Sequence, residues 1–296
     1  GVSALEMALW DLKGKALKIP VYEFLGGKQR DVLQVYANDW CFEHSDPSDL
    51  ARRATEVVGE GYRAIKLYPL GKVGEGSTVV KHIKNREVCR TEEKRCLEAV
   101  RAVRTAIGDD VELLIDVTAE GTPDMMIRIG QKIEEFAPYY YEEALDLFDV
   151  DSYRLLRQKV NLPLAAGERL YTRYGFRPLI ENRYVDIVQP DPGTCGGIME
   201  AWRIASMAET YQMRIAPHNC GGPILTAACV QISACVGNFA MQEVFPYRPQ
   251  IHYDIVDYAL EHSVKNGMLS VPDRPGLGVS LNHKTVDPFL VYSRGN

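Results

Sequence analysis

Short apolar runs that favour β-structure alternate with longer helical patterns from about residue 33 onward. In the helical patterns, such as Asp49–Gly59 and Glu92–Ile107, apolar residues recur three and four positions apart, so one face of each predicted helix is apolar. This alternation is typical of a parallel sheet whose strands are joined by crossover helices. Eight strand-like runs follow one another along the chain: Leu33–Ala37, Ala64–Tyr68, Leu113–Val117, Tyr139–Glu142, Pro163–Ala166, Val185–Gln189, Arg214–Pro217 and Phe239–Glu243.

Eight strand–helix units predict an α/β fold in which the sheet closes into a barrel. A doubly wound open sheet is the alternative, but none of the predicted helices opens with a Gly-x-Gly-x-x-Gly pattern. The regular spacing of the strands is interrupted once, by a segment rich in Gly and Lys over Pro69–Arg90. Connections this long are uncommon in compact domains, so we interpret this one either as a lid or binding loop or as a disordered surface insertion.

The first residues of the chain also form a helical pattern, with Leu5, Leu9 and Leu12 on one face. They do not resemble a signal peptide, because they lack a basic start and acidic residues interrupt the apolar stretch. We therefore expect the chain to begin partway through a structural unit.

Composition and charge exclude several classes of protein. The chain has 46% apolar and 25% charged residues, as in ordinary globular proteins, and a net charge of −6 with no basic tract. This charge gives no electrostatic case for binding nucleic acid or an anionic membrane, and no apolar run approaches the roughly 18 residues needed to span a bilayer. The seven cysteines form no Cys-x-x-Cys pair. We therefore expect reduced, mostly buried thiols and a cytoplasmic enzyme.

Three successive predicted strands each end in a carboxylate. These are Asp116, Glu142 and Glu168, and 26 residues separate each from the next. The carboxyl ends of barrel strands form one face, so the three side chains should meet there. Crowded carboxylates repel one another unless a cation lies between them, and oxygen ligands favour Mg²⁺. The alternative is three independent acids, each paired with an arginine or lysine at a helix start.

The next two strands end in Gln189-Pro190-Asp191 and in Pro217-His218-Asn219. Adjacent parallel strands would bring Asp191 within hydrogen-bonding reach of His218. A carboxylate that holds one ring nitrogen fixes the tautomer of a histidine and raises its basicity, as a general base requires. A structural histidine that bridges two loops is the alternative.

Three more candidates lie at the same strand ends. Glu243 closes the eighth strand and adds a further acid to this face. Lys66 closes the second strand and either extends to solvent or points toward the ligand. Tyr68, two positions later, should share its side of the strand.

Taken in this order, these residues resemble the enolase superfamily, in particular its mandelate racemase subgroup. The resemblance implies a (β/α)₇β TIM-like barrel with an α+β capping domain. It also implies that Asp116, Glu142 and Glu168 bind Mg²⁺, that His218 and Asp191 act as the base pair, and that Lys66 and Glu243 stabilise the substrate. The matching segments span nearly the whole chain: Ser3–Leu25 with Gly26-Gly27, Lys66, Asp116, Glu142-Glu143, Gly167-Glu168, Gln189-Pro190-Asp191 with Gly196-Gly197-Ile198, Pro217-His218, and Pro275-Gly276-Leu277-Gly278.

The resemblance divides the chain into residues 1–28, the end of the capping domain, residues 29–265, the barrel, and residues 266–296, which return to the cap. Most of the family's capping domain has no counterpart in this sequence. The racemases of the subgroup carry a second lysine at the position of Tyr68, and related dehydratases often carry an acid/base group at the position of Thr118. The usual Glu-Glu-Pro is Glu142-Glu143-Ala144 here.

From these residues we predict a Mg²⁺-dependent acid-sugar dehydratase. A base takes the proton α to a carboxylate, an enediolate forms, and loss of the β-hydroxyl gives a 2-keto-3-deoxy acid. Racemisation needs a base on each face of the carbon, and Tyr68, with an ordinary pKa of about 10, would need strong activation. A racemase or epimerase of a 2-hydroxy acid and a non-catalytic, truncated Mg²⁺-binding barrel are the alternatives.

The predicted partner is a small acid sugar or hydroxy-carboxylate, and we expect a homo-oligomer. We place substrate specificity in the part of the capping domain without a counterpart in this sequence, in the segment Trp40–His44 and in the long segment Pro69–Arg90 after the second strand. The expected substrate contacts are Trp40, His44, Thr118 and Asn219.

Overall fold

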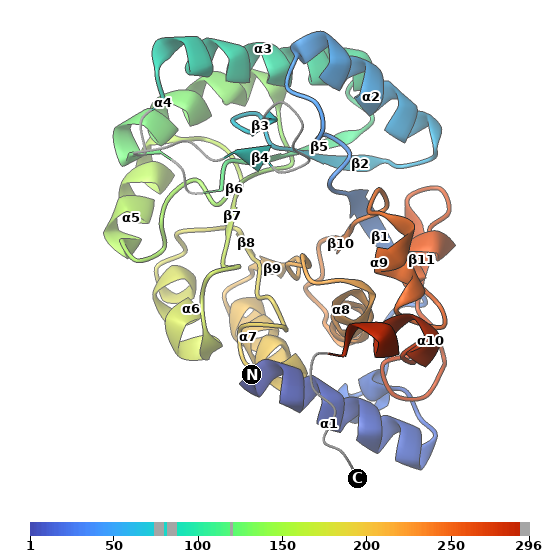
Figure 1. Cartoon of the computed structure of the whole chain (residues 1–296). Helices are drawn as coiled ribbons and strands as arrows, with labels where there is room; N and C mark the ends of the chain where they lie inside the picture. Colours follow the sequence, from blue (N-terminus) through green and yellow to red (C-terminus); the bar gives the residue numbers. More distant parts are fainter. Residues whose placement is uncertain (74–79, 82–87, 119–120, 291–296) are drawn as a thin grey trace.

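The computed structural model describes residues 1–73, 80–81, 88–118 and 121–290. Eight parallel strands surround a central axis in Figure 1, in the order β10-β1-β2-β5-β6-β7-β8-β9. A parallel bridge between Ile215 and Phe239 joins the two ends of this order, so the sheet closes as predicted. The strands are β1 (Val32–Ala37), β2 (Ala64–Leu67), β5 (Glu112–Asp116), β6 (Tyr140–Glu142), β7 (Leu164–Ala166), β8 (Ile187–Val188), β9 (Arg214–Ile215) and β10 (Gln242–Val244).

Helices follow the strands and form the outer wall of the barrel (Figure 1). Most are amphipathic, and α3 buries Val100, Val103 and Ile107 against the sheet. Helix α8 differs, because nearly all its side chains are buried. The seven helices that connect successive strands are α2 (Pro47–Gly59), α3 (Arg90–Ile107), α4 (Pro123–Ile133), α5 (Val150–Lys159), α6 (Thr172–Glu181), α7 (Ile198–Thr210) and α8 (Pro223–Cys235).

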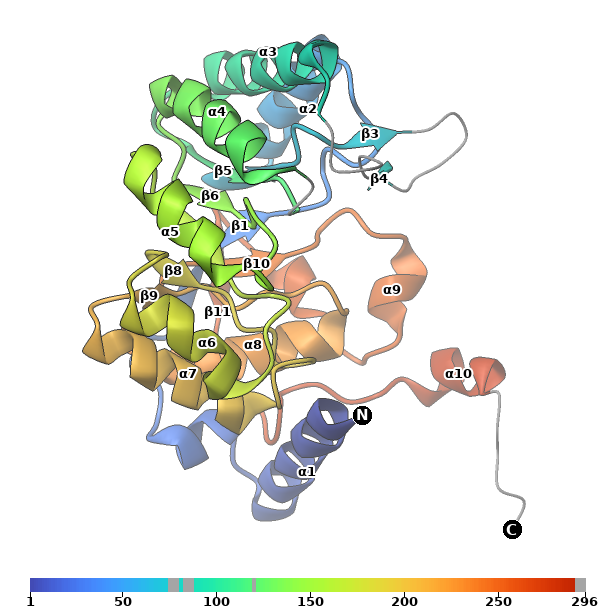
Figure 2. The same ribbon diagram turned by 90° about the vertical axis from the view of Figure 1, so that its left-hand side faces the viewer.

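Short elements complete the described chain. Figure 2 shows α10 (His283–Val286) lying away from the barrel wall. In the rest of the described residues, β11 (Met268–Ser270) pairs antiparallel with β1, and β3 (Lys72–Val73) pairs with β4 (Val80–Lys81). The remaining elements are η1 (Val21–Leu25), η3 (Glu134–Phe136), α9 (Gln250–Asp254), η4 (Leu260–Ser263) and η5 (Asp287–Phe289).

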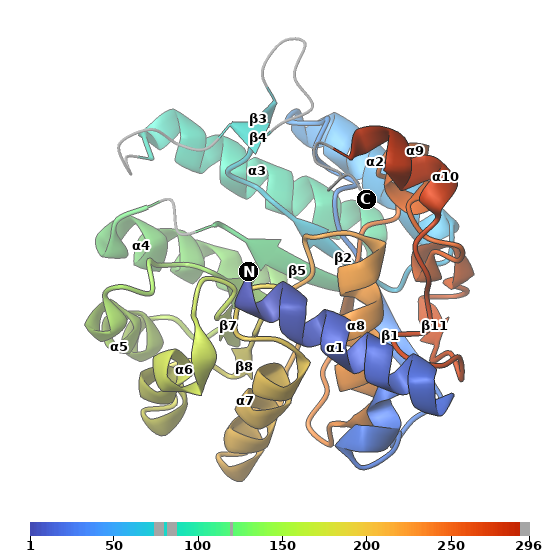
Figure 3. The ribbon, with the colours of Figure 1, turned by 60° about the horizontal axis from the view of Figure 1, so that its bottom comes forward.

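The first helix, α1 (Val2–Leu17), forms as predicted, but it does not bury the leucine face that predicted it. Leu5, Leu9 and Leu12 are each more than half exposed. Instead, α1 is held against α7 by polar contacts, because the carboxylate of Glu6 accepts hydrogen bonds from the backbone N–H groups of Ile198 (2.8 Å) and Met199 (3.0 Å). Figure 3 shows α1 crossing the barrel at this side.

The structure bears on the predictions for the cysteines, for membrane-spanning helices, for the long segment after β2 and for the division of the chain. Five of the seven cysteines are buried and free, whereas Cys89 and Cys220 are exposed. No helix among the described residues is both long and apolar enough to cross a membrane. Most of the long segment after β2 lies outside the described residues, so its interpretation as a lid stays a prediction. The division at residues 28 and 265 also stays a prediction, although Gly276 does pair with Pro20.

Candidate active site

The barrel interior is built in layers, and two of them position the site. The lower layer is apolar apart from two tyrosine hydroxyls, and each of the eight strands contributes one residue to it: Tyr36, Ala64, Leu114, Tyr140, Ala165, Ile187, Ala216 and Met241. Because side chains alternate along a strand, the residue two positions later should also face inward. Those positions hold a second layer, which is polar except for one glycine: Asn38, Lys66, Asp116, Glu142, Gly167, Gln189, His218 and Glu243. We call this set the polar layer.

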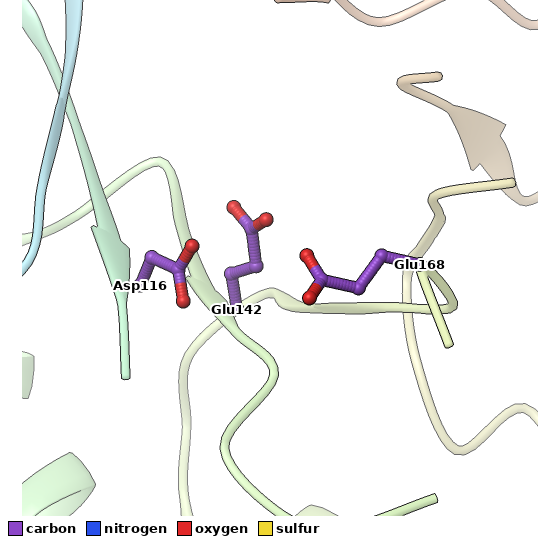
Figure 4. Close-up of side chains that lie close together, drawn as sticks. All are labelled: Asp116, Glu142 and Glu168. Carbon is purple, nitrogen blue, oxygen red and sulfur yellow. The ribbon is translucent and has the colours of Figure 1, made fainter. Parts of the chain in front are cut away.

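Asp116, Glu142 and Glu168 converge from neighbouring strand ends (Figure 4). Each offers a carboxylate oxygen, and these oxygens lie within 4.8 Å of one another. Glu168 joins the group although it stands one position later than the strand alternation would require. At Gly167, whose φ of 137° is open to glycine but strained for other residues, the chain turns so that Glu168 faces inward. A side chain at 167 would also meet Phe176.

These acids are strongly desolvated. Asp116 and Glu142 are buried, and burial raises the pKa of Asp116 to about 6 and that of Glu142 well above its usual value. Lys66 opposes this shift, because its buried ammonium lies 3.0 Å from Glu142 Oε1 and 3.4 Å from Asp116 Oδ2. Glu142 Oε2 has no hydrogen-bond partner among the described residues. Three crowded carboxylates with an unpartnered oxygen fit a divalent cation that prefers oxygen ligands.

His218 and Asp191 form the predicted pair. Nδ1 of His218 lies 2.8 Å from Asp191 Oδ2, and Nε2 faces the acids, 3.3 Å from Glu168 Oε2. Asp191 is itself held by the backbone N–H of Gly193, which donates to Oδ1 at 2.6 Å. Burial would lower the pKa of His218, but the bond to Asp191 and the charges of Glu168 and Glu243 outweigh it and raise that pKa to about 10. Without a metal ion the imidazole is therefore protonated at neutral pH, and it lies between Asp191 and the carboxylates, whose charge a bound cation would offset so that the ring could act as a base.

Comparison with known proteins shows the family to which the chain belongs. Residues 49–285 fit the family model for enolase C-terminal domain-like proteins. Residues 1–26 fit the N-terminal domain of the mandelate racemase and muconate lactonizing enzymes. The chain belongs to the enolase superfamily. The predicted resemblance to its mandelate racemase subgroup is thus confirmed at the level of the family.

Several members of the superfamily are similar over most of this chain. A D-gluconate dehydratase of Thermoproteus tenax is 35% identical over 289 residues, which cover 97% of this chain and 56% of the relative. A D-galactonate dehydratase of Ralstonia pickettii is 32% identical, over 96% of this chain and 72% of the relative. The crystal structure of an enolase superfamily member from Salmonella Typhimurium superposes with a TM-score of 0.90 at 34% identity, over 97% and 75% of the two chains. This chain thus spans little more than half of the T. tenax relative.

The residues predicted at the second and eighth strands come together in this superfamily member. Lys66 Nζ lies 2.7 Å from Glu243 Oε1, and Tyr68 shares its side of the strand, with its ring centroid 5.5 Å from the ammonium. Burial raises the pKa of Tyr68 well above its usual value, although the charge of Lys66 lowers it. Tyr68 is therefore a neutral phenol, which already carries its proton and cannot take another.

The four expected substrate contacts have different surroundings. Trp40 and His44 line a cavity of about 360 Å³ beside the site, together with Asp39, Phe42, Arg248 and others. Thr118 directs its backbone N–H to Asp116 Oδ1 at 2.8 Å. Their role as substrate contacts stays a prediction.

Asn219 is buried and forms hydrogen bonds to Glu243. Its backbone N–H donates to Glu243 Oε2 at 2.8 Å, and its side-chain amide donates to Thr226 Oγ1 at 2.9 Å and to the carbonyl of Glu243 at 3.1 Å. These bonds make Asn219 a positioning residue for Glu243 and leave its Oδ1 for other contacts. Its role as a substrate contact also stays a prediction.

Three residues of the site were not among the predicted site residues. Asn38 donates to Glu243 Oε1 at 2.6 Å and to the hydroxyl of Tyr68 at 3.0 Å. Gln189 is fully buried in the polar layer. Glu143 is also buried; it accepts the backbone N–H of Gly167, and burial together with the charge of Glu168 raises its pKa to about 8. The signal for Asn38 and Gln189 was their place two residues after an inward-facing strand position.

Proposed function

We propose that this chain is an acid-sugar dehydratase, a hydro-lyase that converts an aldonic or aldaric acid to a 2-keto-3-deoxy acid with Mg²⁺ as its cofactor. The observation that carries the proposal is that the described residues of the site hold one histidine base, His218. His218, held by Asp191 through Nδ1, directs Nε2 at the carboxylate cluster, where it lies 3.3 Å from Glu168 Oε2. The named activities of the similar dehydratases support the same reaction class.

The residues of the chain have separate tasks in this reaction. His218 Nε2 takes the proton α to the substrate carboxylate, while Asp191 keeps the other ring nitrogen protonated. Mg²⁺ bound by Asp116, Glu142 and Glu168 would supply positive charge that stabilises the enediolate. The buried ammonium of Lys66 adds charge from the adjacent strand, and Asn38 and Asn219 hold Glu243 in place beside it.

Elimination follows proton abstraction. The electron pair left at the α-carbon forms a double bond to the β-carbon, and the β-hydroxyl departs as water after receiving a proton. That proton comes either from His218, once it is protonated, or from the neutral phenol of Tyr68. The resulting enol then tautomerises to the 2-keto-3-deoxy acid.

The state of Tyr68 favours dehydration over racemisation. A racemase needs a second base on the opposite face of the α-carbon, and the phenol of Tyr68 keeps its own proton because burial raises its pKa. An elimination needs an acid at that stage, which a protonated phenol can be.

The test is a screen of the Mg²⁺-loaded protein against aldonic and aldaric acids, scored for 2-keto-3-deoxy product. We expect turnover of at least one acid and a loss of about 10²–10⁴-fold in His218→Asn. Unchanged turnover in His218→Asn would refute the mechanism. Interconversion of epimers without keto acid would identify a racemase, and binding of Mg²⁺ without turnover of any acid would identify a non-catalytic barrel.

A further inference from the structure

Gln189 differs from the other side chains of the polar layer because its amide has no hydrogen-bond partner among the described residues. Neither Oε1 nor Nε2 forms a hydrogen bond to any described residue, although the side chain is fully buried. Every other polar side chain of the layer makes at least one hydrogen bond or ion pair within the described structure: Asn38, Lys66, Asp116, Glu142, His218 and Glu243.

The backbone fixes where this amide points. Ile187 faces the barrel interior, Val188 packs into the core outside the sheet, and Gln189 therefore faces inward again. Its backbone N–H donates to the carbonyl of Ala166 at 3.0 Å, which ties it to the strand that leads to Glu168. On its other side lies β9, the strand that leads to His218. Gln189 thus stands between the metal-site acids and the base, at the same depth in the barrel.

The same fold satisfies its other buried glutamines. Gln242 accepts from Ser233 Oγ and donates to the carbonyl of Glu243, both at 2.9 Å. Gln231 accepts from the backbone N–H of Tyr22 and donates to the carbonyl of Leu277. A buried amide without such partners is destabilising, because it loses its bonds to water and gains none in return. The unpartnered amide of Gln189 therefore lowers the stability of the fold, which an apolar side chain at this position would not do.

We propose that Gln189 binds a hydroxyl group of the substrate, either on the carbon that loses its proton or on the neighbouring carbon that loses its hydroxyl. This inference rests on the proposed function and adds a specificity-determining residue to it. A primary amide donates at one end and accepts at the other, which matches hydroxyl groups on adjacent carbons. A site built to bind a hydroxyl discriminates strongly against an analogue that lacks it, because its own polar group is then left unpaired.

The first arm of the test measures ligand affinity. We would titrate D-gluconate and its 2-deoxy and 3-deoxy analogues into the Mg²⁺-loaded His218→Asn protein by calorimetry, with and without Gln189→Met. Gln189→Met should weaken D-gluconate binding about tenfold or more, and it should leave the affinity for one of the deoxy acids almost unchanged. Equal weakening of all three acids, or weakening of none, would overturn the proposal.

The second arm measures thermal stability without any ligand, and it uses Gln242→Met as the matched control. Gln242→Met breaks two internal hydrogen bonds and should lower the Tm, whereas Gln189→Met removes an unpartnered amide and should keep or raise it. A fall in Tm with Gln189→Met as large as that with Gln242→Met would show a structural amide and overturn the proposal.

The two arms separate this inference from the proposed function. If no acid binds to the protein with Gln189 intact, the proposed function fails, and the thermal arm still decides whether the amide has an internal partner. If D-gluconate binds but the deoxy acids respond to Gln189→Met as D-gluconate does, only the role of Gln189 fails.

Discussion

Replacing Lys66 with methionine tests whether its ammonium stabilises the buried carboxylates of the site. Its fully buried ammonium lies 2.7 Å from Glu243, 3.0 Å from Glu142 and 3.4 Å from Asp116. Methionine is unbranched and of similar length, so Lys66→Met removes the charge with little change in shape. It leaves three buried carboxylates without their nearest cation.

We expect Lys66→Met to lower the free energy of unfolding by a large amount. Removing one partner of a buried ion pair costs about 3–5 kcal/mol, because the remaining charge is buried without compensation. At about 2–4 °C per kcal/mol for a domain of this size, the Tm should fall by roughly 6–20 °C.

The loss of stability in Lys66→Met should also depend on pH. Without Lys66 the pKa values of Glu142 and Asp116, already raised by burial, rise further above those of the unfolded chain. The folded variant then binds more protons than the unfolded one, so its stability falls as pH rises through this range. The destabilisation should be greater at pH 8 than at pH 5.

Urea unfolding of the metal-free protein at the two pH values measures these effects. Lys94→Met is the control, since Lys94 is an exposed lysine with an ion-pair distance of 3.7 Å, and its loss should change stability by no more than about 0.5 kcal/mol. A Lys66→Met variant as stable as the wild type at pH 8, or one destabilised more at pH 5, would refute the reasoning.

Three shorter predictions follow from other parts of the site. Mg²⁺ at about 100 times its Kd should stabilise the wild type by about 2.7 kcal/mol, and Glu168→Gln should remove most of this gain in thermal unfolding; equal stabilisation of both proteins would contradict the assigned ligand. Gly167→Ala should cost a few kcal/mol in urea unfolding, because the residue has a φ of 137° and a Cβ there would lie 2.5 Å from Phe176, whereas Gly59→Ala, in open helical surroundings, should be neutral or stabilising. Burial raises the pKa of Asp39 to about 7, so the folded protein binds this proton more tightly than the unfolded chain does. The stability of the fold should therefore fall as the pH rises from about 4 to 7, and Asp39→Asn should flatten that part of a plot of Tm against pH. The same plot for Asp39→Asn and the wild type would contradict the raised pKa of Asp39.

The eight strands and the acids at their ends could be predicted because both follow from local pattern. An apolar run that ends in a carboxylate marks a strand end at the active face of a barrel, and Asp116 and Glu142 lie there. The position of Glu168 depended on the turn at Gly167, which the sequence shows only as a glycine before an acid. The pairing of His218 with Asp191 followed from the order of the strands.

Other features required the folded chain. Leu5, Leu9 and Leu12 predicted the helix α1 correctly but not its buried face, because hydrogen bonds to Glu6 decide how the helix sits on α7. Asn38 and Gln189 carry no charge, and only their place two residues after an inward-facing strand position separates them from ordinary loop residues. Their importance becomes visible only when the inward-facing layer of the barrel is assembled.

The most direct test of the central claim follows the α-proton itself. D-Gluconate, incubated with the Mg²⁺-loaded protein in D₂O, would be observed by NMR beside a parallel sample of His218→Asn. The account predicts that the wild type removes the C2 proton and forms a 2-keto-3-deoxy acid that carries deuterium at C3, and that His218→Asn forms none in the same time. Formation of this product at the same rate by both proteins would contradict the assignment of His218 as the base.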